Sequence, residues 1–177
     1  GNQVALYTSP TFGGATFYVS HGQDDQDAGG TSSAVGMSYT AGDFTFGFGY
    51  AEGEFNNAAP NTVAGLPAGA RLDEEAFGIG MKYTFGSTVI AAQYQDGEIS
   101  TAGASVDNED LDLSVTFAAG AGTVGVMASF DLTADTENGY GVWYDMPLGG
   151  GATFNVAAGR NEASSQDEFG VGISMAF

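Results

Sequence analysis

The last ten residues of the chain alternate between large and small side chains. The large residues are Phe169, Val171, Ile173, Met175 and Phe177, and those between them are Gly170, Gly172, Ser174 and Ala176. Because successive side chains of a β-strand point to opposite faces, this segment predicts a strand with one apolar face and one small or polar face. The last residues of a soluble domain are usually frayed and polar. A strand that runs to an aromatic residue therefore indicates a membrane β-barrel whose closing strand is anchored by Phe177.

The same alternation recurs in eleven segments of the chain. Their approximate bounds are 3–9, 14–22, 33–41, 44–53, 75–85, 88–97, 109–119, 123–133, 138–146, 152–161 and 168–177. No glycine-free window shows the spacing of an amphipathic helix, and no apolar run reaches the roughly 18 residues of a transmembrane helix. The sequence therefore predicts an all-β fold, a transmembrane antiparallel up-and-down β-barrel, with residues 1–177 in one domain.

The connections between these segments alternate in length. Short glycine-containing turns are expected at 41–43, 86–87, 120–122 and 147–151, and longer polar loops at 22–32, 54–74, 97–109, 133–138 and 161–167. Glycine supplies the positive φ angles that tight hairpins need. Short turns at one end and long loops at the other are typical of outer-membrane barrels, in which the short turns face the periplasm.

Aromatic residues on the apolar faces gather near both ends of the predicted strands. The short-turn end has Tyr39, Phe44, Tyr83, Phe85, Phe117, Tyr144, Phe154 and Phe177, and the long-loop end has Tyr50, Phe77, Tyr94, Phe130, Tyr140 and Phe169. Two aromatic belts are expected where a barrel crosses two membrane–water interfaces. A soluble sandwich or lipocalin-like barrel also alternates, but its outer face normally carries Lys, Glu and Arg, whereas the second face here is mostly Gly, Ala, Ser and Thr.

The charge balance excludes several classes of function. With 3 Lys plus Arg against 22 Asp plus Glu, the net charge is −19, and nucleic acid is not an expected partner because phosphates need positive charge. Cysteine is absent, which excludes zinc–thiolate sites. Catalysis is not expected either, since His21 is the only histidine and no Gly-x-Ser-x-Gly elbow occurs. We therefore predict that the chain is not an enzyme.

Acidic clusters lie in or beside the predicted long loops. Neighbouring carboxylates repel unless neutralised, and oxygen ligands suit Ca²⁺ or Mg²⁺, so these clusters are candidates for a weak metal site. The candidate ligands are Asp24, Asp25, Asp27, Asp107, Glu109 and Asp110. An EF-hand is excluded, because its twelfth position counted from Asp25 is Gly36. A solvated acidic rim is the alternative; a bound cation would bridge phosphates of lipopolysaccharide.

Polar side chains with the parity of the small-residue face are the candidates for a pore lining. They are Tyr18, Lys82, Gln93, Gln95, Asp112, Asp131 and Asp145, together with Trp143 and Asn155. Because the chain has many carboxylates and few basic side chains, we predict that the entrance of the pore attracts cations. Arg160 has the parity of the apolar face, where a charge is costly, so we expect it at the rim or after a bulge. Arg71 is expected in the loop 54–74.

The closing strand 169–177 resembles the C-terminal strand of Gram-negative porins. The hairpins that include 140–145 and 149–154 are similar to those of acidic general-diffusion porins of α-proteobacteria. This resemblance implies a trimeric sixteen-stranded barrel in the bacterial outer membrane, surrounded by lipid and lipopolysaccharide, with a passive water-filled channel for small hydrophilic solutes and ions. It also implies a long loop folded inward as a constriction.

Within that family pattern, eleven strands correspond to the C-terminal part of a longer barrel. The constriction loop would then belong to an earlier part of the barrel, so we do not expect the loop 54–74 to fold inward. A closed barrel of ten or twelve strands is the alternative if one segment is miscounted. The alternative functions are a non-channel outer-membrane barrel, structural or adhesive, and a soluble calcium-binding β-protein.

Overall fold

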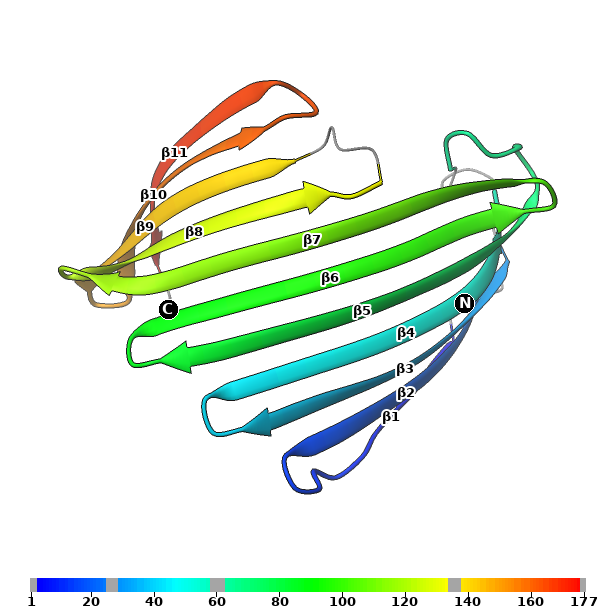
Figure 1. Cartoon of the computed structure of the whole chain (residues 1–177), viewed down its shortest axis with the longest axis horizontal. Helices are drawn as coiled ribbons and strands as arrows, with labels where there is room; N and C mark the ends of the chain where they lie inside the picture. The colour runs from blue at the N-terminus through cyan, green and yellow to red at the C-terminus, as the bar shows by residue number, and fades with distance from the viewer. Residues whose placement is uncertain (1–2, 25–28, 58–62, 134–137, 176–177) are drawn as a thin grey trace. The chain divides into compact units, whose positions relative to one another are not determined.

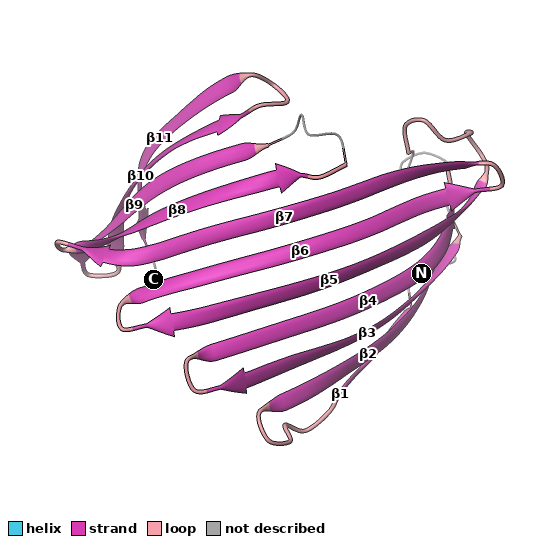
Figure 2. Cartoon of the chain, in the orientation of Figure 1, coloured by secondary structure: helices cyan, strands magenta, loops and turns pink. Residues whose placement is uncertain are grey.

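The computed structural model describes residues 3–24, 29–57, 63–133 and 138–175. They form one antiparallel sheet of eleven strands in which each strand pairs with the next along the chain (Figure 1). The strands are β1 (Gln3–Thr8), β2 (Ala15–Asp24), β3 (Gly30–Ala41), β4 (Phe44–Asn56), β5 (Arg71–Phe85), β6 (Thr88–Thr101), β7 (Ala104–Ala119), β8 (Gly122–Asp131), β9 (Gly139–Gly149), β10 (Ala152–Asn161) and β11 (Gln166–Met175). Turns and loops join them (Figure 2). The all-β, eleven-strand prediction is confirmed.

No helix long and apolar enough to cross a membrane occurs in the described residues. The chain divides into two compact units. Unit 1 comprises Gly1–Gly80 and Tyr94–Glu109, and unit 2 comprises Met81–Gln93 and Asp110–Phe177. Unit 1 thus holds β1–β4 with one part of β5, β6 and β7, and unit 2 holds the other part of these three strands with β8–β11.

In unit 1 the register separates two chemically different faces. Met37 pairs with Phe48 and Tyr39 with Phe46, so these four side chains share one face, which we call the apolar face. The alternate positions form the polar face, where small residues meet across the strands. Its pairs include Ala34–Ala51, Gly36–Gly49 and Ser38–Gly47. The alternation in the sequence is therefore the alternation of the folded sheet.

Unit 2 has the same separation. Its apolar face carries the pairs Leu113–Ala128, Val115–Val126 and Val156–Val171, and its polar face carries Asp112–Ser129, Thr116–Gly125 and Asn155–Gly172. Many large residues of the apolar face are exposed, including Val126, Val142 and Ile173. An exposed apolar face of this extent is unusual for a protein in water, and it fits a sheet whose outer surface meets lipid.

The hairpin between β6 and β7 differs from the sequence-based expectation. A long loop at 97–109 was expected, but β6 continues to Thr101 and β7 begins at Ala104, with a turn at Gly103 whose φ is 102°. The acidic residues of this segment therefore lie on strands. Ladder hydrogen bonds join backbone groups, so acidic side chains do not by themselves end a strand.

The connection between β4 and β5 is organised around Asn57, which is only 2 % exposed. Its Nδ2 donates to the carbonyl oxygens of Leu66 at 3.1 Å and Pro67 at 3.0 Å, and its Oδ1 accepts from the backbone N–H of Val63 at 2.7 Å. Its own backbone N–H donates to Ala70 at 2.8 Å. A single side chain thus satisfies several backbone groups that a loop would otherwise leave to water.

One residue of this connection, Gly65, lies close to the polar face of unit 1. A methyl group built on Gly65 would lie 3.8 Å from Cγ2 of Val106, which has the parity of the polar face on β7. Leu72, with the same parity on β5, is completely buried, whereas Arg71 and Asp73 beside it are exposed. Leu66 in this connection is buried too. The expectation that the loop does not fold inward as a constriction stays a prediction.

Candidate functional site

Aromatic side chains interact across neighbouring strands of the apolar face. The rings of Phe77 and Tyr94 lie 5.7 Å apart in unit 1, and those of Phe130 and Tyr140 lie 6.0 Å apart in unit 2. These distances are typical of tilted and edge-to-face aromatic pairs. All four residues belong to the predicted belt at the long-loop end.

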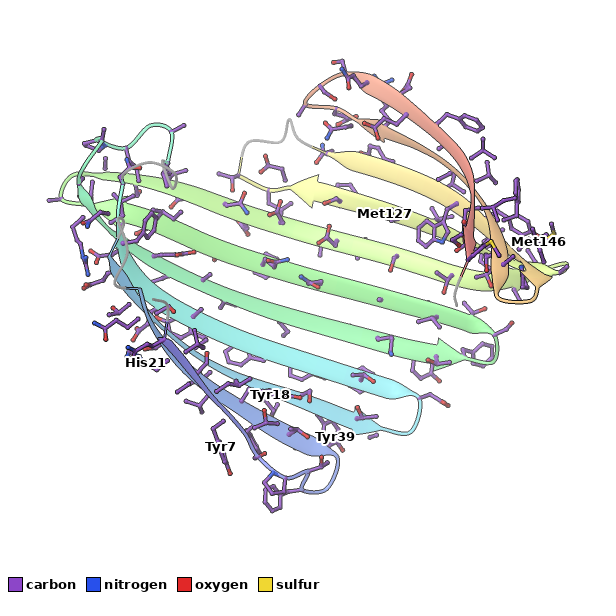
Figure 3. The ribbon with its side chains drawn as sticks, turned by 180° about the vertical axis from the view of Figure 1, so that it is seen from behind. Tyr7, Tyr18, His21, Tyr39, Met127 and Met146 are labelled. Atoms are coloured by element: carbon purple, nitrogen blue, oxygen red, sulfur yellow. The ribbon has the colours of Figure 1, made fainter. Side chains whose placement is uncertain are left out.

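The residues of the predicted short-turn belt also follow the apolar face. Tyr39 and Phe44 do so in unit 1, where Tyr39 is labelled in Figure 3. In unit 2 the members are Tyr83, Phe85, Phe117, Tyr144 and Phe154, and Phe177 lies outside the described residues. Tyr144 donates from its hydroxyl to the carbonyl oxygen of Ala119 at 3.4 Å. The belt thus has the parity that a membrane interface requires, and its role stays a prediction.

On the polar face of unit 1, Tyr18, labelled in Figure 3, pairs with Gly36 of β3. Its hydroxyl is 3.2 Å from Oγ of Ser38, and a methyl group built on Gly36 would lie 3.9 Å from its ring. Gln95 lies on the same face, because a methyl group built on Gly78 of this face would be 3.8 Å from its Cγ. Both residues therefore belong to the face that was predicted to line a pore.

On the polar face of unit 2, carboxylates are held by neighbouring polar groups. Asp112 Oδ1 accepts a hydrogen bond from Ser129 at 2.6 Å, and Asp145 Oδ1 accepts one from Asn155 Nδ2 at 2.7 Å. Asn155 Oδ1 accepts a further bond from Ser174 at 3.2 Å. Two fixed negative charges therefore lie on this face. Lys82 and Gln93 have the same parity on β5 and β6, within unit 2.

Asp131, also predicted to line the pore, has a different surrounding. It is only 9 % exposed, its Oδ1 accepts from the backbone N–H of Thr133 at 2.8 Å, and its backbone N–H donates to Asn138 Oδ1 at 3.2 Å. Asn138 in turn donates to Glu162 at 3.1 Å. These bonds link Asp131 to the connections that follow β8 and β10. Its carboxylate stabilises the backbone at Thr133.

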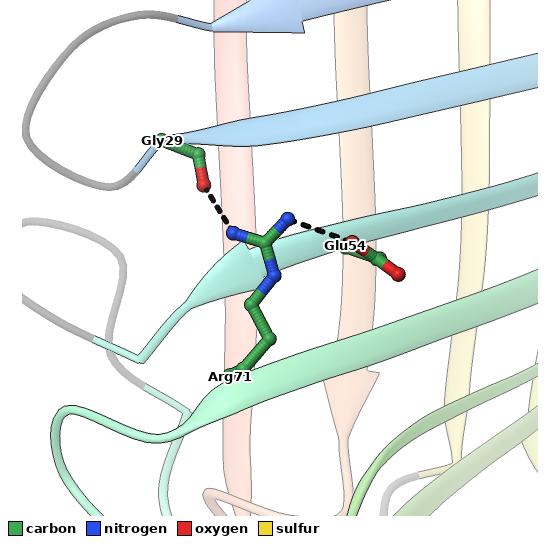
Figure 4. Close-up of polar contacts among 3 residues, drawn as sticks. All are labelled: Gly29, Glu54 and Arg71. Atoms are coloured by element: carbon green, nitrogen blue, oxygen red, sulfur yellow. Dashed lines mark hydrogen bonds and ion pairs between the residues drawn. The ribbon is translucent and has the colours of Figure 1, made fainter.

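Two arginines lie at the ends of strands with the parity of the apolar face. Arg71 is the first residue of β5, so its expected place in a loop is wrong, and it contacts Glu54 Oε2 at 2.7 Å and the carbonyl of Gly29 at 3.0 Å (Figure 4). Arg160 contacts Asp167 at 3.1 Å. The β10–β11 register is continuous through Arg160, which rules out a bulge there and fits the rim position.

The proposed metal ligands do not gather in the described part of the chain. Asp25 and Asp27 lie outside the described residues, and Asp24 ends β2. Along β7, alternation places Asp107 and Glu109 on one face and Asp110 on the other. Glu109 accepts a hydrogen bond from Tyr94 at 2.6 Å. Within the described residues no group of three or more His, Asp or Glu is suited to a metal ion, so a Ca²⁺ or Mg²⁺ site stays an unsupported prediction.

Comparison with known proteins places the chain in a family. The family model described as "Gram-negative porin" matches residues 1–166. The chain belongs to the Gram-negative porins. This confirms the resemblance to Gram-negative porins, an outer-membrane location and the expectation that the chain is not an enzyme.

Solved porin structures match nearly the whole chain. A porin refined at 1.8 Å resolution has a TM-score of 0.77 and 27 % identity, and the match covers 99 % of this chain and 62 % of that one. The anion-selective porin of Comamonas acidovorans has a TM-score of 0.72 and 17 % identity, with 98 % and 55 % covered. OmpT of Vibrio cholerae has a TM-score of 0.63 and 15 % identity, with 98 % and 60 % covered.

The chain thus spans less than two thirds of the length of these porins. Comparison with curated protein sequences gives no match. The likeness at 17 % and 15 % identity concerns the fold, so the properties of the channel have to be argued from the residues of this porin.

Proposed function

We propose that this porin contributes the wall of a passive, water-filled channel for small hydrophilic solutes and ions. The observation that supports this function most is the separation of faces in both units. One face carries exposed aliphatic and aromatic residues, and the other carries Gly, Ala, Ser, Thr and fixed carboxylates. In a membrane barrel the apolar face meets lipid and the polar face lines the lumen.

A filled, non-conducting barrel is the competing function. Its interior would need bulky side chains that interlock. The polar face of unit 1 instead pairs glycine with glycine at Gly36–Gly49, and alanine with alanine at Ala34–Ala51. Short side chains of this kind favour space for water over a packed plug.

We further propose that the channel prefers cations. Fixed carboxylates at Asp112 and Asp145 lie on the polar face, whereas Arg71 and Arg160 have apolar-face parity and are each paired with an acid. Lys82 is the one remaining lysine or arginine of the sequence. Charged groups that line a pore attract the opposite ion and slow ions of the same sign. The anion-selective porin of Comamonas acidovorans has a similar fold, so local charge decides selectivity.

The family resemblance supports a homotrimer embedded in outer-membrane lipid and lipopolysaccharide. Native mass spectrometry of the detergent-purified full-length protein tests this state, and a monomer at all protein concentrations would contradict it.

The channel itself is tested by inserting the full-length protein into a planar bilayer. We expect stepwise conductance in KCl and, under a KCl gradient, a reversal potential of the sign that K⁺ selectivity produces. Absence of conductance at every voltage would reject the channel. Conductance with a reversal potential of the opposite sign would keep the channel and reject the cation preference.

A further inference from the structure

The polar face of unit 2 carries the only tryptophan of the sequence, Trp143 on β9. Its indole ring occupies the space that a side chain at Gly125 on β8 would fill, because a methyl group built on Gly125 would overlap three atoms of the ring. Packing against a glycine backbone restricts the ring to one orientation. Trp143 is therefore a positioned aromatic surface, not a side chain that moves freely on the sheet.

The residues around Trp143 leave part of this surface accessible. On the same face its cross-strand neighbours are the small residues Gly125 and Ala157. Gly141 lies two residues away on β9, and the side chain of Met127 fills the space above it. The tryptophan is half-buried, and its indole nitrogen has no hydrogen-bond partner among the described residues. An aromatic ring that stands above small neighbours can receive a solute on its open side.

A carboxylate lies next to this ring along the same strand. Asp145 is two residues beyond Trp143, and therefore on the same face. Asn155 donates to Asp145 Oδ1 at 2.7 Å and is itself oriented by Ser174 at 3.2 Å. The second oxygen, Oδ2, has no hydrogen-bond partner among the described residues. One oxygen thus fixes the side chain and the other is available to a ligand.

The charges of the surrounding strands select the kind of ligand. The acidic residues with polar-face parity on β7–β11 are Asp110, Asp112, Asp131, Asp145 and Glu168. Arg160 is the only lysine or arginine of these five strands, and it has apolar-face parity and contacts Asp167. A surface with this balance attracts cations and repels anions.

We propose that Trp143 and Asp145 form a subsite for small organic cations, such as quaternary ammonium ions, on the polar face of β8–β10. The ring quadrupole of tryptophan attracts a cation more strongly than that of Tyr or Phe, and Asp145 supplies the compensating charge. This inference rests on the proposed channel function, and it names a class of solute that the channel would retain. K⁺, which keeps its hydration shell, gains less from the ring than a weakly hydrated organic cation.

The first experiment measures binding without conduction. Tetramethylammonium chloride is added to the full-length protein in detergent, and the emission of Trp143 is taken as the difference between wild type and Trp143→Leu. We expect a saturable change that KCl does not produce at the same ionic strength. Asp145→Asn should raise the half-saturation concentration about threefold to tenfold, and Asp167→Asn, on the apolar face, should leave it unchanged.

The second experiment measures block of the K⁺ current by tetramethylammonium in planar bilayers. Trp143→Leu should raise the half-blocking concentration about threefold to tenfold, and Trp143→Phe, which keeps a ring, should raise it less. Tyr140→Leu, on the apolar face of the same strand, should leave it unchanged. Equal block of wild type and Trp143→Leu would overturn the subsite.

The outcomes separate the subsite from the channel. A K⁺ conductance without any saturable emission change would overturn the subsite and keep the channel. A saturable change that Asp145→Asn weakens, in a protein without conductance, would support the subsite and reject the channel. An equal emission change with glucose in place of tetramethylammonium would overturn the assignment to cations.

Discussion

Arg71 and Glu54 form an ion pair across the ends of β4 and β5, with Nη2 and Oε2 2.7 Å apart. The second nitrogen of the guanidinium, Nη1, donates to the carbonyl of Gly29 at 3.0 Å, just before β3 begins. One side chain therefore connects three strand ends of unit 1. The fork of five donors makes arginine suited to such a double contact, which lysine cannot reproduce.

Replacing Arg71 by alanine is expected to destabilise the protein only slightly. The two side chains are 48 % and 52 % exposed, and half-exposed ion pairs contribute about 0–1 kcal/mol. The free energy of unfolding, measured by urea titration in lipid vesicles, should fall by at most about 1 kcal/mol. Arg160→Ala, which removes a more exposed pair, is the control and should cost no more. A loss several times larger would show that the contact organises the sheet and does not merely join its ends.

Replacing Asn57 is expected to have a larger, local effect. Asn57→Ala removes three described backbone partners from a buried position, and unsatisfied buried groups cost about 1–3 kcal/mol each. Hydrogen exchange of the amides of Val63 and Ala70 should become at least tenfold faster, while amides in the middle of β3 stay protected.

The control is Asn57→Asp, which keeps the size of the side chain and its acceptor but loses both Nδ2 donors. It should accelerate exchange nearly as much as the alanine variant. Unchanged exchange in both variants would contradict the view that Asn57 organises the connection.

The strands of this fold could be predicted from the sequence, whereas the hydrogen bonds of Asn57 could not. The period of two in segments such as 44–50 predicts a strand directly, because backbone geometry alone links alternation to faces. The described bounds of β4 and β7 agree with the expected segments at their short-turn ends. The bonds of Asn57 depend on the path of a loop, and no local pattern encodes that path.

For the candidate site, the sequence predicted which face each residue lies on, but not which residues of neighbouring strands lie opposite each other. Parity identified Tyr18, Asp112 and Asp145 as members of the polar face, and the pairs with Ser38, Ser129 and Asn155 follow from register. Register also decides that Trp143 faces Gly125, which requires knowing which residues of β8 and β9 are opposite. The loop predicted at 97–109 is wrong because acidic composition does not prevent a strand, and Asp107 and Glu109 lie on β7.

Neutralising the two fixed carboxylates of unit 2 should weaken the cation preference. Asp112→Asn and Asp145→Asn together remove two charges from the polar face while keeping side-chain size. The ratio of K⁺ to Cl⁻ permeability, from reversal potentials at 0.1 M KCl, should fall about twofold, as expected for solvated charges screened over about 10 Å. Asp167→Asn, on the apolar face, should not change the ratio. A ratio that stays constant in the double variant would place the origin of selectivity elsewhere.

A larger residue at Gly125 is expected to destabilise the protein, because Trp143 occupies the space above this glycine. A methyl group there would overlap the indole ring, so Gly125→Ala must displace the tryptophan or shift β8. Overpacking of this kind costs about 1–3 kcal/mol, and the emission maximum of Trp143 should move as the ring leaves its place. On the same face, a methyl group at Gly170 meets no atom within 4 Å, so Gly170→Ala is the matched control and should change stability by less than about 0.5 kcal/mol. If Gly125→Ala keeps both the wild-type emission and the wild-type stability, the ring is not held against β8, and the subsite at Trp143 loses its positioned surface.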